Sequence, residues 1–124
     1  MTGASVTTLL VTIAEPTRLR IINCLAAAPL FVSDLQAVLE LPQPTVSRHL
    51  TVLRQAEVVR DTPVGQFVLY RLQREGSQGR LLAAILDGLV QDEAMKLERH
   101  RALDQSRQRT RTVLGRVPAS VNPQ

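Results

Sequence analysis

Cysteine and aromatic residues are scarce in this chain of 124 residues. Its one cysteine, Cys24, allows neither a disulfide within the chain nor an all-cysteine metal cage. The aromatic residues, Phe31, Phe67 and Tyr70, make up 2% of the chain, too few for the stacking platform that single-stranded nucleic acid requires. No apolar run approaches the roughly 20 residues of a membrane-spanning helix, and no basic segment precedes the first apolar stretch as in a secretory signal. We therefore expect a protein of the reducing cytoplasm.

Acidic residues are outnumbered by basic ones. The chain has 15 basic and 11 acidic residues, a net charge of +4, and Lys96 is its only lysine. Arginine presents a planar fork of donors that matches phosphates and guanine edges, although a GC-rich genome would produce the same composition. The length suits one domain, which we place at residues 1–104. We expect the Arg-rich segment 105–124 to be a flexible tail.

The sequence has no recognisable catalytic constellation. Ser47 and His49 lie two residues apart on a predicted helix, so their side chains point about 200° away from each other. The glycines are scattered rather than grouped into a phosphate-binding loop. We expect no enzymatic activity and no cofactor.

Apolar residues recur at helical spacing through the first half of the chain. Ser33 and Gln36 form a candidate capping box at the start of one helix, which Glu40 to Pro42 would end. Helices are predicted over residues 6–13, 16–28, 33–39 and 43–56. The last two, joined by a short turn, have the outline of a helix-turn-helix.

The spacing then changes to that of strands. Residues 58–62 and 66–72 are predicted to pair across a turn at Pro63–Gly65, before one long helix that begins near Arg80. In the second strand, the side chains of residues 68, 70 and 72 share one face, and those of 67, 69 and 71 share the other. The predicted fold is therefore mainly α with a small β-hairpin, in the order α-α-α-α-β-β-α.

The helix predicted over residues 43–56 has one apolar face, formed by Val46, Leu50 and Leu53. A helix that enters the major groove keeps such a face on the core and leaves the other for bases and phosphates. No residue on the other face is acidic, and Arg48 is suited to a guanine edge. The candidate DNA-binding residues of this helix are Gln43, Pro44, Thr45, Ser47, Arg48, His49, Thr51 and Arg54.

The hairpin is the second candidate contact element. We expect Arg60 and Arg71 to reach phosphates beside the helix, with Gln66 near the hairpin tip. The alternative for each arginine is a solvated surface charge. The combination of helix, turn, helix and hairpin favours sequence-specific binding of double-stranded DNA.

Four segments, in order, resemble the ArsR/SmtB family of bacterial winged-helix repressors. They are Glu15 to Ile21, Ser33 to Leu35, Gln43 to Arg54 with its run Gln-Pro-Thr-Val-Ser-Arg-His-Leu, and Gly65 to Leu72. The resemblance spans residues 5–100 and implies a winged helix-turn-helix homodimer, joined by its first and last helices, on a palindromic operator that overlaps a promoter. In such proteins, ligand binding or thiol chemistry releases the DNA.

The chain departs from the family pattern in the turn and in the wing. Glu40 stands where the family commonly has glycine, and Pro42 stands where it has a capping serine. Gln66 stands where the wing often carries a basic residue. We expect the turn to form, and the wing tip to hold DNA less tightly.

Dimerisation is also indicated by apolar surface on the first and last helices, which exceeds what so small a domain can cover. The alternative is that these two helices pair within one chain. The candidate interface residues are Val6, Leu9, Leu10, Ile13, Leu82, Ile85, Leu86 and Leu89.

What the protein senses is poorly indicated. The family's paired cysteines would fall at Phe31 and Ser33, so we expect no soft-metal site there. The family's zinc site on the last helix leaves only Asp87 and His100 as weak candidates, with surface residues as the alternative. Cys24 is either a redox switch or a buried inert thiol.

We therefore predict a dimeric DNA-binding regulator, a repressor whose effector is unknown. The alternatives are a winged-helix module that acts mainly through protein partners and a constitutive repressor with no ligand. The Arg-rich run over residues 99–116 is open to three interpretations: a solvated helix face, an additional DNA contact or an unordered segment.

Overall fold

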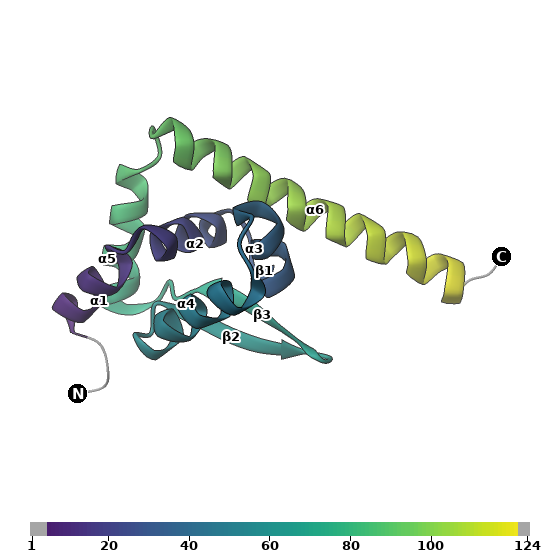
Figure 1. The fold of residues 1–124 in the computed structure, drawn as a ribbon, viewed down its shortest axis with the longest axis horizontal. Coiled ribbons are helices and arrows are strands. Elements are labelled where there is room, and N and C mark those ends of the chain that lie inside the picture. The colour runs from purple at the N-terminus through teal and green to yellow at the C-terminus, as the bar shows by residue number, and fades with distance from the viewer. Residues whose placement is uncertain (1–4, 122–124) are drawn as a thin grey trace.

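The structure, a computed structural model, describes the backbone of residues 5–121 and the side chains of residues 5–109 (Figure 1). Its helices are α1 (Val6–Ile13), α2 (Pro16–Ala27), α3 (Val32–Leu39), α4 (Gln43–Gln55), α5 (Gly76–Gly88) and α6 (Glu93–Val121). Its strands are β1 (Leu30–Phe31), β2 (Val59–Val64) and β3 (Phe67–Leu72). This mainly helical chain with a small sheet confirms the predicted fold class, and α3 and α4 form the expected helix-turn-helix.

The sheet is antiparallel, in the order β1-β3-β2. Val59 lies opposite Leu72, and both are buried. The next pair, Arg60 opposite Arg71, therefore projects from the other face of the sheet, because strand side chains alternate. The two-residue strand β1 was not predicted, since it is too short to show any alternation.

The core lies between α2, α3, α4 and one face of the sheet. The side chains of Val46, Leu50 and Leu53 are each 0% exposed, which confirms the apolar face predicted for α4. Ile21 and Leu25 of α2 are also buried, because this helix packs against α4 and β3 and is covered by α6.

The start of α3 differs from the prediction. The helix begins at Val32, and the buried carboxylate of Asp34 accepts a hydrogen bond of 2.9 Å from the backbone N–H of Phe31. Ser33 is exposed, one residue inside the helix. The predicted box of Ser33 and Gln36 is wrong because Asp34, three residues after Phe31, makes the reciprocal bond instead.

The single last helix that we predicted is two helices. α5 ends at Gly88, and the carboxylate of Asp92 accepts a hydrogen bond of 2.9 Å from the N–H of Met95 at the start of α6. α5 also begins at Gly76, earlier than expected. Gly79 lies in its first turn, and glycine is needed there because a Cβ would lie 2.4 Å from the backbone carbon of Arg74.

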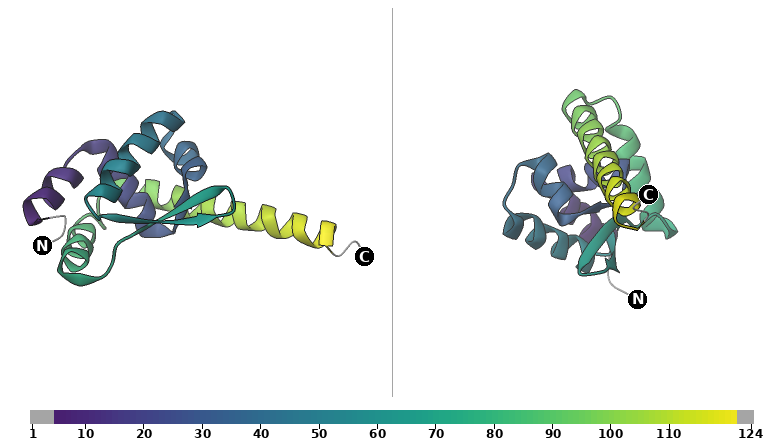
Figure 2. Two further views of the ribbon diagram at one scale, coloured as in Figure 1. Left: turned by 90° about the horizontal axis from the view of Figure 1, so that it is seen from below. Right: turned by 90° about the vertical axis from the view of Figure 1, so that its right-hand side faces the viewer.

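Helix α6 crosses α2 and α3 and continues past them (Figures 1 and 2). The boundary expected at residue 104 falls inside this helix. Gln105 donates to Asp34 over 3.3 Å, and the Nε of Arg109 lies 3.0 Å from the same carboxylate. The first turn of the expected tail is therefore docked on α3, while residues 122–124 lie outside the described part of the chain.

Candidate nucleic-acid interface

The outward face of α4 is open to solvent. Arg48, Thr51 and Arg54 are exposed, as are Gln43 and Pro44. Thr45 and Ser47 are half-buried on the same side. This helix has no acidic side chain to repel phosphate, and its buried reverse face fixes its orientation.

Two hydrogen bonds order the polar side chains of α4. The amide of Gln43 donates to the hydroxyl of Ser47 over 2.6 Å, and the hydroxyl of Thr51 donates to the carbonyl of Ser47 over 3.0 Å. Arg48 makes no hydrogen bond or ion pair within residues 5–109, so its guanidinium is free for a ligand.

His49 lies on the inner flank of α4. Its side chain is 14% exposed, and the guanidinium of Arg18 donates to its Nδ1 over 3.2 Å. Glu15 lies 3.9 Å from the same nitrogen. The structure thus places His49 as a contact between α4 and the start of α2, which the sequence did not reveal because Arg18 lies 31 residues away.

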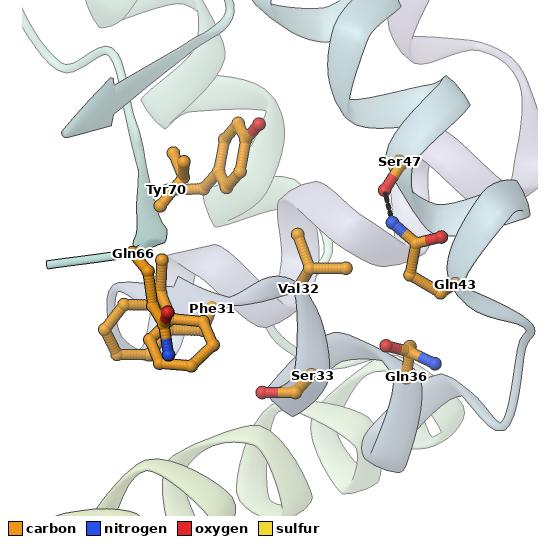
Figure 3. Close-up of a pocket in the computed structure, with 10 residues that line it drawn as sticks. Phe31, Val32, Ser33, Gln36, Gln43, Ser47, Gln66 and Tyr70 are labelled. Carbon is orange, nitrogen blue, oxygen red and sulfur yellow. Dashed lines mark hydrogen bonds between the residues drawn. The ribbon is translucent and has the colours of Figure 1, made fainter. Parts of the chain in front are cut away.

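A groove of about 420 Å³ separates the start of α4 from the wing formed by β2 and β3. In Figure 3, Tyr70 and Gln66 lie on one side of it, Gln43 and Ser47 on the other, and Val32 between them. Gln66 therefore lines the wing side of this groove, across from the start of α4. Burial raises the pKa of the Tyr70 hydroxyl, and the nearby carboxylate of Asp61 adds to this effect.

Arg60 and Arg71 do not lie beside α4. Val68 and Tyr70 face the α4 side of the sheet, whereas Arg60 and Arg71 occupy the opposite face. The strand alternation was predicted correctly, but the sequence does not say which face packs on the helices. The structure therefore does not place these two arginines beside α4, where they were expected, and their contact with phosphates stays a prediction.

The weak metal candidates are not brought together. Asp87 lines a hollow between α2, α5 and α6, while His100 is exposed on α6 near Glu93. Among the described residues, no three His, Cys, Asp or Glu side chains form a group that could hold a metal ion. Cys24 is buried, and this burial raises the pKa of its thiol to about 12.

The residues predicted for a dimer interface divide into two sets. Leu9, Ile13 and Leu82 are buried in the core of the single chain, so they are not available to a partner. The others are exposed or half-buried: Val6, Leu10, Ile85, Leu86 and Leu89. Val11, which was not predicted, is also exposed.

Along the described part of the chain, no helix combines the length and apolar character needed to cross a bilayer.

Comparison with known proteins agrees with this geometry. The model of the bacterial regulatory protein family arsR matches residues 15–61, from the start of α2 into β2. The Biofilm growth-associated repressor of Agrobacterium fabrum is 39% identical over 83 residues, which cover 67% of this chain and 70% of the repressor.

The chain belongs to the ArsR family.

A second relative is the transcriptional repressor SdpR of Bacillus subtilis, 37% identical over 60 residues, or 48% of this chain and 67% of SdpR. This chain thus spans about two thirds of the length of these two relatives. The solved structure of reduced HlyU from Vibrio cholerae superposes with a TM-score of 0.59 at 31% identity, covering 68% of this chain and 83% of HlyU. Membership of the ArsR family makes the chain a DNA-binding transcriptional regulator rather than an enzyme.

Proposed function

We propose that this ArsR-family chain is a dimeric repressor that reads a palindromic operator with the outward face of α4. The contact residues on this helix are Gln43, Pro44, Thr45, Ser47, Arg48, Thr51 and Arg54, and Gln66 adds a contact from the wing. The observation that carries the proposal is the asymmetry of α4, whose apolar face is wholly buried while its basic, acid-free face is exposed.

The chemistry of this face suits a duplex. Arg48 is exposed and has no partner among the described residues, so its two terminal nitrogens are available to the O6 and N7 atoms of a guanine. Thr51 and Ser47 lie one turn apart and are suited to phosphate oxygens that fix the register. Because phosphate contacts release counterions, the affinity falls as the salt concentration rises.

Substitution of Arg48 by alanine tests this proposal. Against a duplex from the chain's own promoter, we expect Arg48→Ala to lower the preference over random DNA by about 5- to 150-fold, the equivalent of one bidentate base contact. Arg107→Ala, which removes the same charge from an exposed position on α6, is the matched control and should keep the preference. A preference that survives in Arg48→Ala contradicts the assignment of α4.

The second part of the proposal is a two-fold dimer built on α1 and α5. These helices lie at the same end of the molecule, away from the C-terminal end of α6 (Figures 1 and 2). Val6 and Leu10 of α1 are 55% and 44% exposed, which is unusual for side chains of this size at helical spacing. A symmetric dimer through this end would cover them and would present two α4 helices to a palindrome.

A charge on the exposed face of α1 tests the dimer. We expect Leu10→Glu to shift the mass measured by light scattering from dimer to monomer, because an unpaired carboxylate would be buried in the interface. Thr7→Glu, at an exposed polar position of the same helix, is the control and should remain dimeric. A dimer that withstands Leu10→Glu places the interface elsewhere.

We further infer that this chain lacks the cysteine metal site of its family. Phe31 and Ser33, at the positions of the paired cysteines, supply no thiolate, and Phe31 instead packs its ring edge-on against Phe67. Arsenite and zinc should therefore leave the protein–DNA complex intact in a gel-shift titration. Release of the DNA by either would contradict this inference.

A further inference from the structure

We propose that the sheet face opposite α4 carries a binding site for the phosphate group of a small molecule. The site, called the rear pocket below, is a hollow of about 320 Å³ lined by Leu25, Pro29, Arg60, Arg71, Leu72 and Arg74, with Glu75 at its side. It is separate from the DNA-binding surface of α4 and does not rest on the function proposed for that surface.

The rear pocket is built around an unfavourable pair of charges. Arg60 and Arg71 are direct partners across β2 and β3, on the same face of the sheet. Like charges directly opposite each other on neighbouring strands destabilise a sheet. A bound anion between the two guanidinium groups would attract both of them and so offset this repulsion.

The positive charge of the pocket is poorly compensated by the protein. The one ion pair at these three arginines within the described residues joins Arg60 and Glu75 over 3.9 Å, and both side chains are exposed. Arg74 makes only a long contact of 3.5 Å with the carbonyl of Ala26, and Arg71 makes no hydrogen bond or ion pair within the described part of the chain. Three guanidinium groups thus face one carboxylate.

The shape and lining favour a small phosphorylated molecule. The volume lies at the lower end of the range for ligand pockets. Guanidinium forks match the geometry of phosphate oxygens, which form charge-assisted hydrogen bonds with them. Leu25, Pro29 and Leu72 add an apolar part to the lining, which suits the uncharged part of such a molecule.

The position of the pocket separates it from the duplex read by α4. Arg60 and Arg71 project from the sheet face that α4 does not occupy, and Arg74 follows β3 just before α5. A ligand here would therefore connect the base of the wing to the end of α2 and the start of α5, at a place where it does not compete with DNA.

Pyrophosphate is a suitable probe, at constant ionic strength, with thermal unfolding and amide chemical shifts as readouts. For the wild type we expect a saturable rise in Tm, with shifts at the amides of Arg60, Arg71 and Arg74. In Arg71→Gln the dissociation constant should rise about tenfold, the usual effect of losing one charge-assisted hydrogen bond. Arg60→Gln should act in the same way.

The matched control is Arg80→Gln, which removes the same charge from an exposed position of α5 outside the pocket. It should bind pyrophosphate like the wild type. Equal weakening in Arg80→Gln and Arg71→Gln, or no saturable binding by the wild type, would overturn the proposal.

A second measurement distinguishes a small ligand from DNA as the source of the phosphate. We expect Arg71→Gln to bind the promoter duplex within about twofold of the wild type, since exposed charges away from an interface have small effects. A loss of DNA affinity as large as that of Arg48→Ala would assign the rear pocket to the DNA backbone and overturn the proposal. Because Arg71→Gln is measured against both pyrophosphate and the duplex, failure of the rear pocket is distinguishable from failure of α4.

Discussion

Cys24, the single cysteine of the chain, lies on α2 and is fully buried in the core of the protein. Burial raises the pKa of its thiol to about 12, and the neighbouring carboxylate of Glu98 adds to this effect. Because the thiolate is the reactive form, the folded protein presents very little nucleophile at neutral pH. Of the two alternatives for this residue, the structure favours the inert thiol.

This state of Cys24 predicts slow alkylation. At pH 8 the folded chain should react with a maleimide about a thousandfold more slowly than the chain unfolded in denaturant, because the difference in pKa lowers the thiolate fraction by that factor. The rates can be followed by mass spectrometry. Equal rates in the two states would show that the thiol is accessible and would favour the alternative that Cys24 is a redox switch.

The raised pKa also predicts a loss of stability in alkali. Since the unfolded thiol ionises first, its contribution to stability is complete below about pH 9 and is lost as the pH rises towards 12. The free energy of unfolding should therefore fall less between pH 9 and 10.5 in Cys24→Ala than in the wild type. Parallel pH profiles of the two proteins would contradict this.

At the scale of elements, the sequence predicted the helices and strands that have a clear apolar spacing and residues that mark where they begin or end. Helix α4 was predicted over 43–56 and runs over Gln43–Gln55, since three buried residues and a proline-rich start mark it. The break between α5 and α6 was missed although Gly88 and Asp92 mark it, because apolar residues continue on both sides. Strand β1 depends on pairing with β3, which no local pattern contains.

The turn between α3 and α4 contains a strained position. Glu40 adopts a left-handed conformation with φ 57° and ψ 47°, where family members commonly have glycine. A side chain in this region costs about 1–2 kcal/mol, which glycine avoids. The chain therefore has a left-handed position in this turn without glycine, the residue that suits such a position best.

Replacing this residue should stabilise the protein. We expect Glu40→Gly to raise the free energy of unfolding by about 0.5–1 kcal/mol, less than the full strain because glycine makes the unfolded chain more flexible. Glu40→Ala, which also loses the exposed contact with Arg101 but keeps the strained backbone, is the control and should not stabilise. Urea unfolding measures both. If the two variants have equal stability, the left-handed backbone is not the cause.

Helix α6 holds both ends of α3 through polar contacts. At the start of α3, Asp34 is almost fully buried and pairs with Arg109. At its end, the carbonyls of Val38 and Leu39 accept hydrogen bonds from Arg101 and from Arg20, and Arg20 also pairs with the Glu98 carboxylate of α6 over 2.7 Å. Arginines of the basic run therefore bind α3 and hold it in place. The number of arginines in the sequence could not distinguish this role from that of a solvated helix face.

Removing the charge of Asp34 should loosen this contact. We expect Asp34→Asn to lower the free energy of unfolding by about 2 kcal/mol, because Arg109 would keep its partly buried charge without a counter-ion. Asp104→Asn, the same change at an exposed position of α6, should have little effect. Chemical denaturation with hydrogen exchange of the α6 amides distinguishes the two. An unchanged α6 in Asp34→Asn would mean that the pair does not dock the helix.

At the scale of the whole molecule, the two faces of the sheet have different surroundings. One face packs towards α4 and shares a groove with it, whereas the other holds Arg60 and Arg71 of the rear pocket. The sequence predicted which side chains share a face, but only the packing of the helices shows which face lies towards α4. For this reason the sequence could not show that Arg60 and Arg71 lie on the face away from α4.

The central claim is that DNA lies against the outward face of α4, and amide chemical-shift mapping with a promoter duplex tests it most directly. We predict the largest shifts at Ser47, Arg48 and Thr51, with smaller ones at the wing tip around Gln66, and that these shifts disappear when the salt concentration is raised. Shifts confined to α6 or to the rear pocket, with the amides of Ser47 to Thr51 unmoved, would contradict the account.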